Sequence, residues 1–218
     1  MIKLKYEELL LELKKHNFKY NSYIHLAIDD KNIREQLINN ITEDNHINIY
    51  YNSYHLVYEA SKDYPKLFYP YWDSLVPLLY NENSYHRSIS HDILTNLIKV
   101  DHDNKFDSIQ EKYFSMIKDE KFSTGLVALR NIMIISEYRQ DLKNKIISLF
   151  LNKDFLINYK ENQINRMEYE IIEFFAKTSF NSDYKNDVVN YIKSSTNSNN
   201  KRIKKIAEKT LKSLTNTK

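Results

Sequence analysis

The chain has 218 residues and a formal net charge of +3; 42% of its residues are hydrophobic and 28% are charged. These proportions exclude an intrinsically disordered chain, and the length is sufficient for one sizeable core or for an array of smaller units. Glycine occurs only once and cysteine never. The scarcity of glycine argues against a β-sandwich, a dinucleotide-binding domain or a P-loop, whose turns depend on glycine, and the absence of cysteine excludes disulfides and thiolate sites.

The basic residues gather at the C-terminal end. From Lys193 onward there are eight Lys and Arg residues against one acid, whereas residues 1–192 carry 24 basic and 28 acidic residues. A protein that binds duplex DNA through its body usually shows the opposite distribution. The N-terminal residues have charges every few positions, and no run approaches the roughly 20 apolar residues of a membrane span. We therefore expect a cytoplasmic protein without a membrane span.

Apolar residues recur with helical spacing along the whole chain. The first stretch, about residues 1–16, predicts a leading helix that caps an array. Ten further helices are predicted, over residues 32–41, 46–60, 71–80, 85–100, 105–118, 122–138, 141–151, 164–177, 184–194 and 200–214. They form five successive pairs, and the second helices begin near residues 45, 84, 121, 162 and 199, at intervals of 37 to 41 residues. Such a pair cannot bury its apolar face alone, so stacking against neighbours must complete the core.

A helix–turn–helix repeat of this length resembles the HEAT and armadillo repeat families over about residues 30–215. The resemblance depends on the paired helices, the polar Asn/Asp break between them, and an arginine early in the second helix, at Arg87, Arg166 and Arg202. Thr124 occupies the comparable place in the 122–138 unit and departs from the pattern. The resemblance implies an all-α, right-handed α–α superhelix of about five helix pairs, formed by residues 1–218 as a single domain.

The second helix of the middle unit, FSTGLVALRNIMIISEY at 122–138, is apolar on several faces. It is therefore expected at the buried centre of the array. Gly125 near its start has two interpretations: it permits a close helix approach, or it is simply a tolerated helix glycine.

The stretch NSYHRSISHDILTNL, residues 83–97, places two histidines close to an arginine and an aspartate. His86 and His91 are five positions apart and thus separated by about 140° around a helix, whereas helical metal sites favour a spacing of four. We therefore expect no metal site here. Arg87 is interpreted as a structural arginine that binds backbone carbonyls or an aspartate. The following loop, Asp101-His102-Asp103, is expected to supply an Asx-type cap for the helix that begins at residue 105.

The densest aromatic run is YPKLFYPYW, residues 64–72. Its ordinary interpretation is core packing around a proline-shaped turn, and the alternative is an exposed aromatic anchor for a partner. Trp72 is the only tryptophan, and Asp73 follows it.

The function expected by analogy with the fold is a non-enzymatic scaffold that presents a curved surface to a protein partner. The alternative is nucleic-acid binding, or base excision as in the HEAT-like alkylpurine DNA glycosylases, which the chain resembles in length and helical content. That resemblance implies an aromatic-lined basic groove and a catalytic Asp, but Val76, one turn beyond Trp72, is not a carboxylate, and no catalytic residue can be assigned. No cofactor is implied. The candidate binding residues are Trp72, Asp73, Arg87, His91 and Arg130.

Basic residues on the inner faces of the second helices would distinguish the two functions. Arg87, Arg130, Arg166 and Arg202 are candidates for such residues. Three glutamates of the 164–177 helix, Glu168, Glu170 and Glu173, argue against a uniformly basic groove.

Overall fold

The structure is a computed structural model that describes residues 2–44, 46–179 and 182–216. Every regular element in these residues is a helix, without a strand, so the all-α prediction is confirmed. The chain divides into two compact units, Met1–Ser115 and Met116–Lys218. No helix in the described ranges combines the length and the apolar character needed to cross a membrane.

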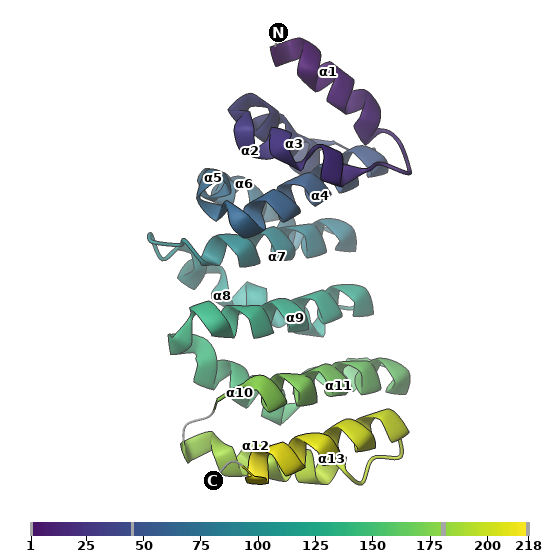
Figure 1. Cartoon of the computed structure of the whole chain (residues 1–218), viewed down its shortest axis with the longest axis vertical. Helices are drawn as coiled ribbons and strands as arrows, with labels where there is room; N and C mark the ends of the chain where they lie inside the picture. The colour runs from purple at the N-terminus through teal and green to yellow at the C-terminus, as the bar shows by residue number, and fades with distance from the viewer. Residues whose placement is uncertain (1, 45, 180–181, 217–218) are drawn as a thin grey trace. The chain divides into compact units, whose positions relative to one another are not determined.

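The first unit is organised around its two longest helices, α4 and α7, which pack against each other. Helix α3 lies along α4 on its other side (Figure 1). The elements in chain order are α1 (Ile2–Leu13), η1 (Tyr20–Ser22), α2 (Ile24–Asp29), α3 (Lys31–Glu43), α4 (Ile47–Asp63), α5 (Pro65–Phe68), η2 (Tyr69–Tyr71), α6 (Trp72–Leu75), η3 (Val76–Tyr80), α7 (Ser84–Ile98) and α8 (Lys105–Ser115), where η denotes a 3₁₀ helix.

The second unit is organised around α9, α11 and α13, which lie side by side in this order (Figure 1). Helix α10 packs on α9 and α12, and α12 packs on α13. The elements are η4 (Met116–Lys118), α9 (Phe122–Tyr138), η5 (Gln140–Leu142), α10 (Lys143–Asn152), η6 (Asp154–Asn158), α11 (Glu161–Lys177), α12 (Ser182–Ser195) and α13 (Lys201–Asn216).

The predicted periodicity of the second helices is confirmed. Helices α4, α7, α9, α11 and α13 begin at residues 47, 84, 122, 161 and 201, at intervals of 37 to 40 residues. Helix α11 begins at Glu161, one residue before the start near residue 162 that the repeat spacing predicts and three before the predicted helix range 164–177. The reason is a polar cap, because the backbone N–H of Lys160 donates to the side chain of Gln163 at 3.0 Å and fixes the first turn.

The prediction of one continuous helix over residues 71–80 is wrong. The structure has a single α-turn in α6 followed by the 3₁₀ segment η3. Pro77 explains the change, because it has no N–H to donate to the carbonyl of Asp73, as an α-helix would require. Helix α2 was not predicted at all, since its six residues are too few to show a periodic pattern.

Helix α9 has the buried stripe expected of it, with Leu129, Ile132 and Ile135 fully buried. The expectation that this helix lies at the buried centre of the array does not hold for Ile134, which remains 37% exposed. The helix thus carries a second, accessible face.

Gly125 makes room for a side chain rather than for another helix. A Cβ atom at this position would overlap the hydroxyl group of Tyr159 and lie 3.0 Å from its Cζ atom and 3.1 Å from the carbonyl oxygen of Ile117. The Tyr159 hydroxyl donates to the carbonyl oxygens of Ile117 at 3.0 Å and Asp119 at 2.8 Å. The glycine therefore lets one phenol hold the end of η4 against α9.

Candidate functional site

An open groove of about 1070 Å³ lies on the second unit, over α9, α11 and α13. Its basic side chains are Arg130, Lys143, Arg166, Lys177 and Arg202, and its acidic side chains are Glu137, Glu170 and Glu173. The lining therefore has two more positive than negative groups. Met133, Ile134 and Phe174 add an apolar part to the same lining.

One of the basic groups is already neutralised within the groove. Arg130 of α9 binds Glu170 of α11 through two nitrogens, with an Nε–Oε2 distance of 2.7 Å. This paired geometry fixes the planar guanidinium group against the carboxylate. Arg130, a predicted binding residue, therefore connects two helices of the groove.

Tyr169 is the aromatic centre of the groove. The Cζ atom of Arg202 lies 4.2 Å from the centre of the Tyr169 ring, and the Tyr169 hydroxyl donates to Glu173 at 3.1 Å. Arg166 lies three positions before Tyr169 in α11, and so on the same face of that helix. Arg202 thus lies over the ring, and Arg166 shares the helix face of Tyr169.

The three arginines that line the groove have similar phases within their helices. Counted from the first residue of the helix, Arg202 is second, Arg166 sixth and Arg130 ninth. At about 100° per residue these three positions fall within roughly 60° of one another. Arg87 is fourth in α7, about 160° from Arg166. Arg87 and Arg166 therefore have different roles despite their similar places in the repeat.

Arg87 is buried, with 8% of its surface exposed, and it binds backbone carbonyls. Its Nη1 atom donates to the carbonyl oxygens of Asn81 at 2.9 Å and Glu82 at 2.8 Å, in the break before α7. The structural interpretation of Arg87 is confirmed. Arg34 of α3 does the same for Ala27 and Ile28 at the end of α2, and sequence reasoning missed it because α2 was not predicted.

His91 is fully buried and stacks on Tyr113, with the ring centres 3.6 Å apart. Its Nε2 atom donates to the carbonyl oxygen of Tyr113 at 3.1 Å. Burial lowers the pKa of His91 to about 3, because the charged form would lose its hydration. His86 instead packs against Tyr50 at a ring distance of 4.5 Å. The described residues include no group of three or more His, Asp or Glu side chains that could hold a metal ion.

The aromatic run is divided between core and surface. Phe68 and Trp72 are buried, with at most 1% exposed, and Tyr69 is 8% exposed. Tyr64 is 49% exposed. Trp72 therefore contributes to the core of the first unit, and the part of the run that could meet a partner lies at Tyr64.

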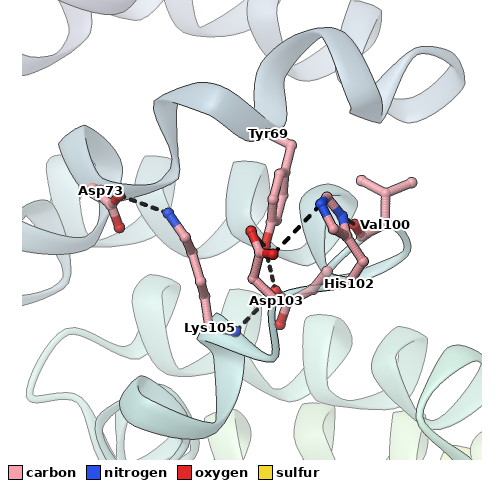
Figure 2. A network of polar contacts seen from close by, with 7 residues as sticks. Tyr69, Asp73, Val100, His102, Asp103 and Lys105 are labelled. Carbon is pink, nitrogen blue, oxygen red and sulfur yellow. Dashed lines mark hydrogen bonds and ion pairs between the residues drawn. The ribbon is translucent and has the colours of Figure 1, made fainter.

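Asp73 and the Asp-His-Asp loop belong to a polar network that joins η2 and α6 to the start of α8 (Figure 2). Asp101 accepts from the backbone N–H groups of Lys105 at 2.9 Å and Phe106 at 2.8 Å, so the predicted cap is present and Asp101 is the residue of the loop that makes it. Its carboxylate also accepts from the Tyr69 hydroxyl at 2.7 Å, and Lys105 reaches Asp73 at 2.6 Å. The network holds the turn between α7 and α8 in place. Burial and the Asp101 hydrogen bond raise the pKa of Tyr69.

The five predicted binding residues do not meet at one place. The groove contains Arg130 alone among them, and a smaller cavity of about 630 Å³, lined by Tyr69, Lys99, His102 and their neighbours, contains none. The sequence offers Arg166 and Arg202 as candidates for the inner face, but it does not single out Tyr169. The signal for Tyr169 was its i, i+3 spacing from Arg166.

Comparison with known proteins adds a likeness of fold only. The scan against family models found no match, and the search of curated proteins found none. The crystal structure of an engineered protein from the Northeast Structural Genomics Consortium is similar, with a TM-score of 0.57 and 14% sequence identity over 95% of this chain and 97% of that chain. At this identity the similarity concerns the path of the chain and brings no activity with it.

Proposed function

We propose that the protein is a non-enzymatic scaffold of the HEAT-like kind, and that the groove on α9, α11 and α13 binds a protein partner. In this proposal the helix pairs form a right-handed α–α superhelix as a single domain. The regular 37-to-40-residue spacing of the second helices supports a repeat architecture.

The observation that carries the proposal is the lining of the groove. Three successive second helices present exposed arginines and the partly exposed Ile134 to the same open space of about 1070 Å³. Enclosed small-molecule sites are about 300–1,000 Å³ and mostly apolar. An open, charged groove with a volume just above that range fits an extended segment of a macromolecule better than a small molecule.

Nucleic-acid binding, including excision of alkylated bases, is the less favoured function. Arg166, Arg202 and Tyr169 would suit a phosphate chain with a stacked base. However, Glu137 and Glu173 line the same groove. Trp72, the only tryptophan, is 1% exposed and could stack on a flipped base only if the core opened.

Site-specific photo-crosslinking in cells tests the proposal. A photoreactive amino acid replaces Ile134 in the groove, and the control places it at Ile157, which is 84% exposed in η6 and does not line the groove. We expect protein adducts at position 134 that are absent at position 157. Identical adducts at the two positions, or adducts at position 134 that are nucleic acid, would contradict the proposal.

A further inference from the structure

We propose that the groove recognises an acidic peptide segment, with Arg166 of α11 and Arg202 of α13 binding its carboxylates. This inference rests on the proposed function and states the chemistry of the partner.

The first argument is the balance of charge in the groove. Glu170 is occupied by Arg130. Arg166, Lys177 and Arg202 make no ion pair with any carboxylate in the part of the chain that the structure describes, and Lys143 contacts only a hydroxyl, that of Ser179 at 3.3 Å. Four cations thus lie along one groove with two carboxylates outside the Arg130 pair, Glu137 and Glu173, and the imbalance favours an anionic occupant.

The second argument is the orientation of Arg202. Its guanidinium group is held at 4.2 Å over the Tyr169 ring. A guanidinium group stacked on a ring keeps its N–H donors at the edge of the plane, where a carboxylate can accept two parallel hydrogen bonds. The stacking reduces the conformational freedom that this side chain would otherwise lose on binding.

The third argument is the spacing of the cations. Packed helices have axes about 8–10 Å apart, and α11 packs directly on α13. An extended peptide advances about 3.3 Å per residue, so one helix-to-helix step corresponds to about three residues. Arg166 and Arg202 therefore suit acidic residues at every third position. The apolar Met133 and Ile134 lie on α9, on the other side of α11 from α13, and can contact peptide residues beyond the one that Arg166 binds.

The same spacing argues against a nucleic-acid strand. A strand carries a phosphate charge about every 3.4 Å in a duplex, without neutral positions. Glu137 and Glu173 would then face phosphate groups, whereas a peptide can place an uncharged residue beside each of them.

Fluorescence anisotropy with the full chain tests the inference, and three labelled probes are used at about 50 mM salt. The first is a 12-residue peptide of Asp-Ala-Ser repeats, the second has Lys in place of each Asp, and the third is a 12-nucleotide deoxythymidine strand. We expect saturable binding of the acidic peptide, at least about tenfold tighter than binding of either other probe.

Matched variants locate the binding. Arg202→Ala and Arg166→Ala should each weaken the acidic peptide about tenfold, as expected for loss of a charge-assisted hydrogen bond. The control is Lys204→Ala, which removes an exposed cation from the opposite side of α13, about 200° from Arg202, and should change affinity by less than about twofold. Circular dichroism checks that each variant is folded.

Three results would overturn the inference: no saturable binding of the acidic peptide, tighter binding of the oligonucleotide, or an equal loss in Lys204→Ala and Arg202→Ala. If any of them occurs while protein adducts still form at position 134, only the acidic chemistry is refuted and the scaffold proposal stands.

Discussion

Replacing Gly125 with alanine gives a direct test of the packing around Tyr159. Alanine is favoured over glycine inside a helix by about 1 kcal/mol, so propensity alone predicts a more stable protein. The structure predicts the opposite, because the added Cβ would overlap the Tyr159 hydroxyl and lie 3.0 Å from its Cζ atom. The hydroxyl group must move by about 1.5 Å to regain an ordinary contact.

That movement determines the size of the effect. The Tyr159 hydroxyl donates to two carbonyl oxygens at 3.0 and 2.8 Å, and a shift of about 1.5 Å breaks both hydrogen bonds. Each bond contributes about 1 kcal/mol, and overpacking costs typically 1–3 kcal/mol. After the gain in propensity of about 1 kcal/mol, we expect Gly125→Ala to lower the free energy of unfolding by about 2–4 kcal/mol.

Urea denaturation followed by circular dichroism measures the effect, with the Tyr159→Phe and double variants completing a cycle. Tyr159→Phe alone should cost about 1–2 kcal/mol, because two carbonyls lose their donor. Without the hydroxyl the added methyl group has more room, so Gly125→Ala should cost at least about 1 kcal/mol less in the Phe background. A more stable Gly125→Ala protein, or purely additive effects, would refute the reasoning.

Three further predictions concern the first unit. Arg87→Ala should lower the free energy of unfolding by about 2–3 kcal/mol in urea denaturation, because two backbone carbonyls lose a charged donor. The control Arg166→Ala should change it by less than about 0.5 kcal/mol. Equal effects of the two variants would contradict the roles assigned to these arginines. In the folded state the pKa of His91 is lowered to about 3, from about 6.5 in the unfolded chain. The contribution of His91 to stability is therefore complete above pH 6.5. Below pH 6.5 the free energy of unfolding declines by up to about 1.4 kcal/mol per pH unit. His91→Gln should flatten that part of the stability profile, and an unchanged slope would show that His91 does not cause it. Asp101→Ala should cost about 1–2 kcal/mol through loss of the α8 cap, measured by thermal unfolding, while Asp103→Ala should stay within about 0.5 kcal/mol; the reverse order would be inconsistent with the network in Figure 2.

The sequence predicted features that depend on local pattern. The apolar spacing located α9 at its observed bounds, and the polar loop at Asp101 predicted a cap that the structure contains. Both follow from residues that lie within one helix or at its start.

Features that depend on distant residues could not be predicted in this way. Gly125 and Tyr159 are 34 positions apart, and nothing local in the sequence pairs a glycine with a phenol. The sequence also could not separate the structural role of Arg87 from the groove-lining role of Arg166. The two arginines point in different directions around their helices, and that direction depends on the residue at which each helix begins. An error of two residues in a helix start moves a side chain by about 200°.

A charge exchange between the groove and its ligand tests the central claim most directly. The Arg202→Glu variant is titrated by fluorescence anisotropy at about 50 mM salt. The probes are the Asp-Ala-Ser peptide and a set of single-Lys peptides, each with Lys in place of a different Asp. The account predicts that Arg202→Glu weakens the acidic peptide at least about tenfold, and that one of the single-Lys peptides recovers most of the loss. Equal binding of all peptides by the wild type and Arg202→Glu would contradict it.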